Sequence, residues 1–294
     1  HNYPTTVYVY ESSSSITWRG SQRSYSFIPV YHTISGTSGY TNGASSITVT
    51  GHGFDTGRTD YRCRFRTSNG YQAYSSNVRP SSATKVTCRT PVWNYPATDY
   101  PTTVYLMHYS NSDVSFSGSK RSWTYIVVYN SISRSSGSAD GAYSFTVYGN
   151  GFNTGLSNYR CKFTASDGSI AYSATVKPPS STELTCRTPV WNFKATSNPT
   201  TVQLLEKTNN AVTWVGSART FTYYPSYKSL DRSSGYADGT HSVVVSGNGF
   251  DTSRSDYRCR FRDGSGNQAY SATIKASSVT SITCRTPIWY YPAT

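Results

Sequence analysis

Residues 148–163 read "YGNGFNTGLSNYRCKF", and close copies of this stretch occupy residues 50–65 ("TGHGFDTGRTDYRCRF") and 246–261 ("SGNGFDTSRSDYRCRF"). Each copy has two glycines around one polar residue, then a Phe, and then a Cys between basic residues. Successive copies start 98 residues apart. A period of this length matches a small independent domain, so the sequence predicts an array of domains rather than one enzyme with a composite active site.

The composition and the spacing of apolar residues indicate an all-β fold. Charged residues make up only 14% of the chain and Tyr occurs 27 times, a bias that favours strands. Phe145 and Val147 alternate with the polar Ser144 and Thr146, which is the period-2 pattern of a half-buried strand. Similar short segments recur between Gly, Asn, Asp and Ser clusters, which predicts antiparallel β-sandwiches. No apolar run approaches membrane-spanning length, so no membrane insertion is expected.

The end of each copy predicts a two-faced strand. Along "YRCKF" (159–163), Tyr159, Cys161 and Phe163 are expected on the core face and the basic residues between them on the outer face. The two preceding glycines are expected to end the previous strand, where close approach or a positive φ angle suits glycine. A phosphate-binding loop would need a helix to begin after these glycines, and no helix is predicted there.

The cysteines indicate disulfides and an oxidising compartment. Each repeat has two cysteines 25 residues apart, and none of the six is left over. No Cys-x-x-Cys occurs and the histidines lie far from the cysteines in sequence, so a zinc site is disfavoured. The expected pairs are Cys63–Cys88, Cys161–Cys186 and Cys259–Cys284. Such bonds contribute about 3–4 kcal/mol each at this loop length and persist outside the cytosol, so an extracellular or cell-surface location is expected.

Three short motifs recur in the same order in every repeat: G-x-G-F, Y-x-C-x-F and C-R-T-P-x-W. This ordered set resembles the IPT/TIG family, immunoglobulin-like domains of plexins, other cell-surface receptors, Rel-type transcription factors and large surface proteins. The resemblance covers all three repeats, although the last one stops before its final segment. It implies tandem seven-stranded sandwiches that serve linkage, adhesion or recognition, normally without catalysis.

This resemblance places the domain boundaries out of phase with the chain. Complete domains are expected at 31–127 and 128–226. Residues 1–30 then hold only the closing hairpin of such a domain, and residues 227–294 open a domain but stop before its closing hairpin. A sandwich without this hairpin exposes unpaired strand edges and an open core, and a hairpin alone is marginally stable.

Each end of the chain therefore has what the other lacks, and two interpretations remain. In one, the chain is a window of a longer tandem-repeat surface protein with the same neighbours in cis, or a processed product, because it opens at His1 rather than Met. In the other, the hairpin of one chain completes the last domain of the next, and this non-closing contact gives a head-to-tail fibril. The expected donor side chains are Val7, Val9, Trp18, Tyr25 and Phe27. The expected acceptors are Val243, Val245 and Phe261.

The net charge of +13 raises the question of an anionic partner. Basic residues that we call the basic rows are expected to face outward in every repeat, namely Arg62, Arg64, Arg66, Arg160, Lys162, Arg258, Arg260 and Arg262. They form either a solvated face or a contact for an anionic glycan or cell-surface polymer. Nucleic acid is disfavoured because paired cysteines argue against a nuclear protein. A surface adhesin or glycan-binding array that stays monomeric is therefore the alternative function.

No catalytic, cofactor-binding or metal-binding residue is predicted. The five histidines fall at non-equivalent points of the repeats, and neither a Gly-x-Ser-x-Gly elbow nor a His-Glu-x-x-His motif occurs. Asp140-Gly141 and Asp238-Gly239 are expected to form turns rather than calcium sites. No Asn-x-Ser/Thr sequon occurs, since Asn198 precedes Pro199, so any glycan is expected to be O-linked.

Overall fold

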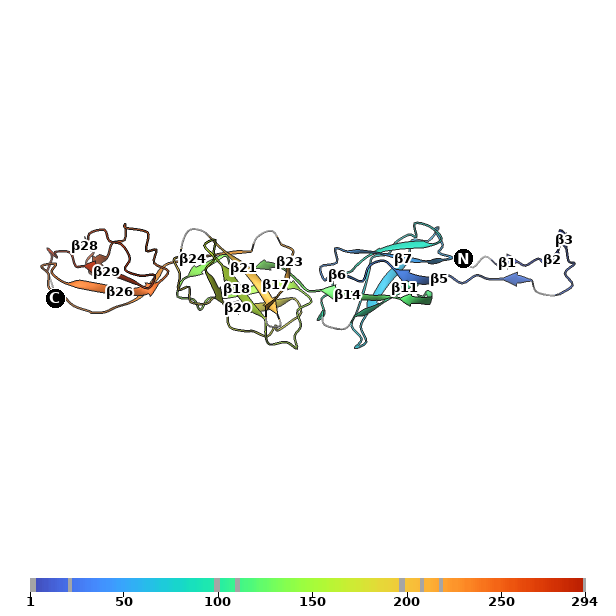
Figure 1. The fold of residues 1–294 in the computed structure, drawn as a ribbon, viewed down its shortest axis with the longest axis horizontal. Coiled ribbons are helices and arrows are strands. Elements are labelled where there is room, and N and C mark those ends of the chain that lie inside the picture. The colour runs from blue at the N-terminus through green and yellow to red at the C-terminus, as the bar shows by residue number, and fades with distance from the viewer. Residues whose placement is uncertain are drawn as a thin grey trace. The chain divides into compact units, whose positions relative to one another are not determined.

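The computed structural model describes residues 4–20, 23–97, 101–108, 112–195, 199–206, 209–216 and 219–292. The chain divides into two compact units, residues 1–127 and 128–294, and both are built from strands (Figure 1). No α-helix occurs among the described residues, so none there is long and apolar enough to cross a membrane. The all-β fold expected from the sequence is confirmed.

The first sandwich has one sheet in the order β10-β7-β5-β13 and a second in the order β6-β14-β11-β8-β9, with β12 paired to β11. Its strands are β5 (Val30–Ile34), β6 (Ser38–Tyr40), β7 (Ser46–His52), β8 (Arg62–Arg66), β9 (Gln72–Tyr74), β10 (Lys85–Arg89), β11 (Thr102–His108), β12 (Ser112–Asp113), β13 (Ser115–Lys120) and β14 (Ser122–Ile126). β7, β8, β10 and β14 bury alternate side chains between the two sheets, as the period-2 pattern predicts.

The second sandwich repeats this topology, with sheets in the orders β20-β17-β15-β23 and β16-β24-β21-β18-β19 and with β22 paired to β21. Its strands are β15 (Val128–Ile132), β16 (Ser136–Ser138), β17 (Ser144–Asn150), β18 (Arg160–Thr164), β19 (Ile170–Tyr172), β20 (Glu183–Arg187), β21 (Thr200–Glu206), β22 (Asn210–Ala211), β23 (Thr213–Trp214) and β24 (Thr220–Tyr224). In β18, Cys161 and Phe163 are fully buried while Arg160 and Lys162 are partly exposed. The two faces of this strand are therefore those that its sequence predicts.

Disulfides join the two sheets of a sandwich. The bonded pairs are Cys63–Cys88, Cys161–Cys186 and Cys259–Cys284, the same pairs that the 25-residue spacing indicates. Cys161 lies on β18 of one sheet and Cys186 on β20 of the other. In the two complete sandwiches the bond therefore ties an inner strand of one sheet to the edge strand of the facing one.

The closing segment of each complete sandwich, which we call the closing hairpin, belongs to both sheets. In the second sandwich it is residues 199–224: β21 pairs with β18 and β24 in one sheet, while β23 pairs with β15 in the other. The β15–β23 and β16–β24 pairs are parallel, unlike the remaining pairs, because the chain changes sheets twice within this segment. At Gly216 the crossing is so close that a Cβ would lie 2.0 Å from the Asn130 carbonyl oxygen, which only glycine avoids.

The third module consists of a three-stranded sheet, β25-β26-β29, and a two-stranded sheet, β27-β28. Its strands are β25 (Ser226–Leu230), β26 (Ser242–Asn248), β27 (Arg260–Arg262), β28 (Gln268–Tyr270) and β29 (Ser281–Arg285). In the described part of the module, residues 225–292, no strand takes the place of β21, β23 or β24. The module is therefore a sandwich without its closing hairpin.

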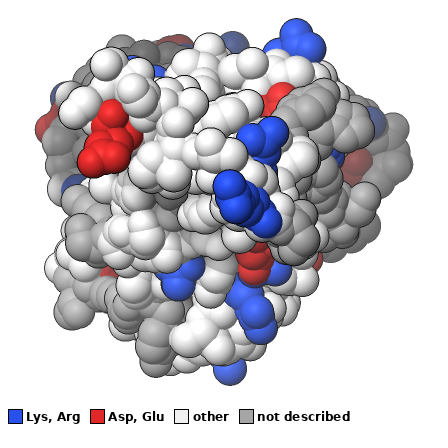
Figure 2. Space-filling view, turned by 90° about the vertical axis from the view of Figure 1, so that its right-hand side faces the viewer, with Lys and Arg blue, Asp and Glu red and all other residues white. Residues whose placement is uncertain are grey.

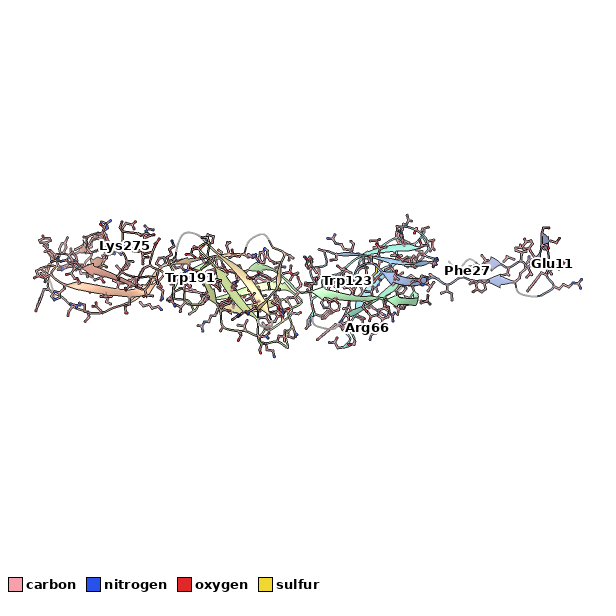
Figure 3. All side chains as sticks on the ribbon, viewed as in Figure 1. Glu11, Phe27, Arg66, Trp123, Trp191 and Lys275 are labelled. Atoms are coloured by element: carbon pink, nitrogen blue, oxygen red, sulfur yellow. A yellow bond between two sulfur atoms is a disulfide. The ribbon has the colours of Figure 1, made fainter. Side chains whose placement is uncertain are left out.

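In residues 4–20 and 23–28, the described part of the N-terminal segment, the strands form only two-stranded pairs, β1 with β4 and β2 with β3. These strands are β1 (Thr5–Thr6), β2 (Tyr10–Glu11), β3 (Ser14–Ser15) and β4 (Ser24–Tyr25). Every described residue between Pro4 and Ile28 is exposed. Figure 3 shows this contrast, since Trp123 lies among the strands of its sandwich and Phe27 lies on the segment outside it.

The disulfides give a first prediction. Without reductant, the intact chain should be six hydrogen atoms lighter than the reduced chain, two for each bond. Peptide mapping by mass spectrometry should recover linked peptides only within each pair. Free thiols at Cys63 and Cys88 would contradict both the sandwich and the extracellular location, because a reducing compartment would leave these cysteines unpaired.

Candidate assembly site

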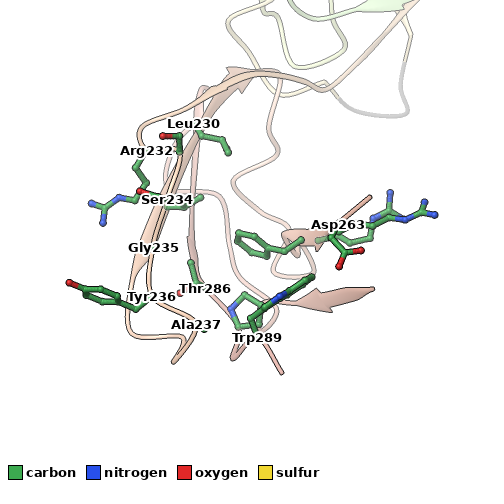
Figure 4. A pocket seen from close by; sticks show the side chains of 15 residues that line it. Leu230, Arg232, Ser234, Gly235, Tyr236, Ala237, Asp263, Thr286 and Trp289 are labelled. Atoms are coloured by element: carbon green, nitrogen blue, oxygen red, sulfur yellow. The ribbon is translucent and has the colours of Figure 1, made fainter. Parts of the chain in front are cut away.

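A hollow of about 490 Å³ opens where the third module lacks its closing hairpin. Figure 4 shows it between the segment from Leu230 to Ala237 on one side and Asp263 on the other, with Trp289 at its base. Val243 and Phe261 also line it. The hollow thus reaches the core-face residues Val243, Phe261 and Trp289, and polar residues of the neighbouring segments form the rest of its wall.

Three aromatic positions show how open this core is. Phe65 and Phe163 are fully buried in the two complete sandwiches, whereas their counterpart Phe261 is partly exposed. Trp289 is likewise partly exposed, although the tryptophans at this position in both complete sandwiches are 1% exposed. Tyr227 is 75% exposed, against 1% for Tyr31. Because a fully buried aromatic contributes about 1.5–3 kcal/mol, the module leaves much of its hydrophobic stabilisation unused.

The closing hairpin fills the same space in the second sandwich. Phe163 lies opposite Val202 on β21, so the first arm of the hairpin covers the middle of the sheet. The second arm brings Tyr223, whose ring stacks on Trp191 with centroids 4.7 Å apart and an interplanar angle of 9°. Phe221 lies edge-on to Phe163 at 5.7 Å. The first sandwich has the same arrangement with Tyr125 stacked on Trp93 at 4.7 Å.

The tyrosine that opens each sandwich holds the hairpin by its hydroxyl. The Tyr31 hydroxyl donates a hydrogen bond to the Val104 carbonyl oxygen at 3.0 Å, and the Tyr129 hydroxyl donates to the Val202 carbonyl oxygen at 3.2 Å. Each ring also contacts an aromatic ring of the hairpin, as Tyr129 does with Trp214 at 4.8 Å. This tyrosine therefore fixes both the backbone and the side chains of the closing hairpin.

The N-terminal segment is built like a closing hairpin. The sequence Pro-Thr-Thr-Val begins at Pro4, Pro101 and Pro199. Thr5 lies opposite Tyr25 and donates its side-chain hydrogen bond to the Tyr25 carbonyl oxygen at 2.7 Å. Thr102 with Trp123 and Thr200 with Phe221 make the same pair and the same bond, both at 2.8 Å. The pairing of the two arms is thus present in a segment whose described strands pair only with one another.

The structure leaves all five expected donor side chains exposed, from 46% for Trp18 to 72% for Phe27. Of the expected acceptors, Val243 and Phe261 line the hollow. Val245 does not line it, since it packs against the small cluster around Phe250. Val245 therefore already belongs to the module's own core.

Sequence reasoning missed Tyr227 and Trp289 as parts of this site. Both could have been found from the 98-residue step, which relates Tyr227 to Tyr129 and Trp289 to Trp191. What the sequence does not give is their exposure. That follows only from the absence of a described strand over the hollow.

The basic rows lie on the outer face of the sheet and contact aromatic rings. The guanidinium carbon of Arg62 lies 4.3 Å from the ring centroid of Tyr74, and Arg160 and Tyr172 repeat this contact at 4.3 Å. Arg258 lies 5.5 Å from the Tyr270 centroid. Figure 2 shows basic side chains in separate patches between uncharged ones on the face in view. The rows therefore present an Arg–Tyr stack in each of the three repeats.

Other basic-row residues are engaged by partners of their own. Arg64 forms an ion pair with Asp113 at 3.0 Å and stacks on Tyr105 at 4.4 Å. Arg160 also donates a hydrogen bond to the Asn209 side chain. The part of the chain that the structure describes holds no group of three or more His, Cys, Asp or Glu side chains that could bind a metal.

The comparisons with known proteins give a family. The family profile described as IPT/TIG domain matches residues 29–118, 128–223 and 225–292, which confirms the resemblance expected from the motifs. No curated protein matches the chain. A solved structure described as "Crystal structure of tetra-tandem repeat in extending region of large adhesion protein" is 12% identical with a TM-score of 0.27; the match covers 88% of this chain and spans 66% of that chain's length.

The open core predicts unequal effects of one substitution in two modules. Phe163→Ala should lower the local free energy of unfolding by about 3–5 kcal/mol because it removes a fully buried ring. Phe261→Ala should cost much less in dilute protein, since that ring is partly exposed. Hydrogen exchange measured on β18 and β27 peptides compares the two. Equal losses would mean that the core of the third module is closed in the isolated chain.

The basic rows give a separate prediction. Replacing Arg62, Arg64 and Arg66 together by Ser should weaken retention on an anionic polysaccharide column and flatten its salt dependence, because three partly screened charges are lost. A variant with Arg79, Arg134 and Arg232 replaced by Ser has the same net charge and is the matched control. Equal retention of the two variants would show that the basic rows are a solvated face and not a specific contact for the polysaccharide.

Proposed function

Because the chain belongs to the IPT/TIG domain family, we propose that it is an extracellular structural protein that assembles head-to-tail into a fibril. The N-terminal hairpin of one chain completes the third module of its neighbour. One observation carries this proposal: the third module exposes the core that two sister sandwiches cover with a hairpin, and the N-terminal segment is an exposed copy of that hairpin. The same completion in cis by a further repeat is the competing arrangement.

We call the contact between the N-terminal hairpin of one chain and the third module of its neighbour the joint. Its strand register follows from the two complete sandwiches. Val104 lies opposite Phe65, and Leu106 lies opposite Cys63. The matching pairs at the joint are Val7 opposite Phe261 and Val9 opposite Cys259 of the neighbour. Both valines then face the disulfide-bonded core, and Tyr8 between them faces outward and meets the basic row.

The second arm of the hairpin fills the hollow. By the same equivalence, Phe27 stacks on Trp289 as Tyr125 stacks on Trp93. The buried hydroxyls of Tyr125 and Tyr223 have no hydrogen-bond partner among the described residues, and burial raises the pKa of each above its ordinary value. Phe27 has no hydroxyl to desolvate, so it suits this slot better than the residues that occupy it in cis.

Tyr227 is the hydrogen-bonding anchor of the proposed joint. Its hydroxyl would donate to the Val7 carbonyl oxygen, as the hydroxyl of Tyr31 does to that of Val104. Its ring would meet Trp18, as Tyr129 meets Trp214. The Tyr227 ring, which is 75% exposed in the single chain, would thus become buried at the joint. This burial would account for a large aromatic ring at an exposed position of β25.

A cation–π sandwich would lock the outer face of the joint. In the first sandwich, Tyr105 lies between Arg64 at 4.4 Å and Arg121 at 4.7 Å. In the N-terminal hairpin, Arg23 already lies 5.2 Å from the Tyr8 ring centroid. Arg260 of the neighbour would take the place of Arg64. The second sandwich has Gln203 at the tyrosine position, so the joint resembles the first sandwich more than the second.

The apolar area that the joint would bury gives a gain of the same order as the cost of association. Burying four apolar donor side chains gives about 6–12 kcal/mol in total. Loss of translational and rotational freedom costs on the order of 4–15 kcal/mol, and ordering of each side chain costs about 0.5–1.5 kcal/mol more. Two added strand pairs contribute hydrogen bonds against this cost. Because the contact uses different surfaces of the two chains, it propagates into a filament instead of closing into a dimer.

The proposal includes a non-catalytic role at or outside the cell surface. Paired cysteines support the location, and IPT/TIG domains typically serve as immunoglobulin-like modules rather than enzymes. A second role as a surface adhesin or glycan-binding array is favoured by the Arg–Tyr stacks that recur in all three repeats. O-linked glycans on Ser/Thr-rich loops are compatible with either role.

If the hairpin joins the subunits, a variant without it cannot polymerise. A chain lacking residues 1–28 should not form filaments, because it offers an acceptor but no donor, while both complete sandwiches stay folded. Moving residues 1–28 to follow Thr294 through a short linker should close the third module in cis and give a monomer. Sedimentation velocity and electron microscopy at several concentrations measure both outcomes.

Two point variants sharpen the test. Tyr227→Phe should leave the monomer's stability unchanged and weaken filaments by about 0.5–1.5 kcal/mol per joint, since one hydrogen bond is lost. Tyr129→Phe removes the same bond within a sandwich and should destabilise the monomer instead. Filaments that persist in the permuted chain would show that lateral contacts, not hairpin donation, join the subunits.

A further inference from the structure

Two histidines from neighbouring strands direct ring nitrogens at one point. His32 lies on β5 and His52 ends β7, and the His32 Nε2 and His52 Nδ1 atoms are 3.0 Å apart. Their ring centroids are 5.2 Å apart at an interplanar angle of 62°. We propose that this pair, which we call the histidine clamp, binds a first-row transition-metal dication with Cu²⁺ preferred.

The distance suits coordination by both rings. Two nitrogens about 2.0 Å from one metal ion are about 2.8 Å apart at right angles and about 3.3 Å apart in a tetrahedron. The observed 3.0 Å lies between these values. Imidazole suits Zn²⁺, Ni²⁺ and Cu²⁺, and the ordinary order of affinities places Cu²⁺ highest. Neither histidine is buried, so water can complete the coordination shell.

A third strand orients the clamp. The Ser117 hydroxyl on β13 lies 3.0 Å from the His32 Nδ1 atom, on the side of the ring away from His52. When the His32 Nδ1 atom carries the proton and donates a hydrogen bond to the Ser117 hydroxyl oxygen, the Nε2 lone pair faces His52 and is available to a metal. Such an outer partner fixes the tautomer and ring orientation of metal-binding histidines in general.

The fold explains why His32 and His52 meet although they are 20 residues apart. The β5–β7 register shifts between Tyr31 and Thr33, so His32 is the extra residue of a bulge. Bulges re-aim side chains, and this one directs His32 toward the end of β7. The other two repeats keep the bulge but have no histidine at either position: Asn130 and Asn150 in one, and Lys228 and Asn248 in the other.

The same geometry without metal is a hydrogen bond between the two rings, so the experiment must separate a clamp from a shared proton. The full chain should carry His1→Ser, because an amino-terminal histidine chelates Cu²⁺ through its own amine and imidazole. The test variants in this background are His32→Asn and His52→Asn, which carry the residue found at both positions of the second sandwich. His241→Asn is the control, since it removes a histidine from the third module.

Isothermal titration with Cu²⁺ and electron paramagnetic resonance of the bound ion provide the readouts. The background chain should bind one Cu²⁺ whose spectrum shows two equatorial imidazole nitrogens. Either clamp variant should lose this site or weaken it by more than about tenfold, and His241→Asn should retain it. Unchanged binding in His52→Asn, or a spectrum with one nitrogen ligand, would overturn the clamp and leave the pair as a hydrogen bond. Neither result depends on whether the chain forms filaments.

Discussion

Each complete sandwich of this chain depends on one segment that belongs to both of its sheets. The closing hairpin covers the core with β21 and β24 on one side and reaches the edge of the other sheet through β23. Disulfides tie the sheets together in all three modules, including the open one. The disulfides therefore keep the two sheets together, whereas the closing hairpin determines whether water reaches the core between them.

Because the disulfide and the closing hairpin have separate roles, the third module can be folded although it lacks the hairpin. Cys284 and Ile282 stay buried in a small cluster, while Phe261 and Trp289 border the hollow. The missing part is a single contiguous segment and not a set of scattered contacts. One continuous hairpin would therefore complete the module, which is the condition that the proposed strand donation requires.

The repeat made much of the fold predictable. The 98-residue step and the alternation around Cys161 were enough to predict the sandwiches and the cysteine pairs. The parallel β15–β23 pair was not predictable, because nothing in the local pattern tells when a strand leaves its sheet. The His32–His52 contact was missed for a related reason: it depends on a register shift across two strands, and no sequence spacing encodes that shift.

The N-terminal hairpin also shows which of its features the proposed joint constrains. From Pro4 to Pro101 the step is 97 residues, whereas Gly20 and Gly118 are 98 apart, so one residue is missing between the two arms. The missing residue falls in the outer loop, near the exposed β2–β3 pair. The core-facing positions of both arms keep their apolar character, and Gly20 keeps the position at which Gly118 and Gly216 pass a backbone carbonyl. In the undocked hairpin a Cβ at Gly20 would lie 2.6 Å from the Trp18 ring, whereas at Gly118 and Gly216 it would lie 1.7 Å and 2.0 Å from a backbone carbonyl oxygen. A side chain can turn away and a strand backbone cannot, so the proposed docking on β25 would make the glycine requirement strict where the free hairpin leaves it weak.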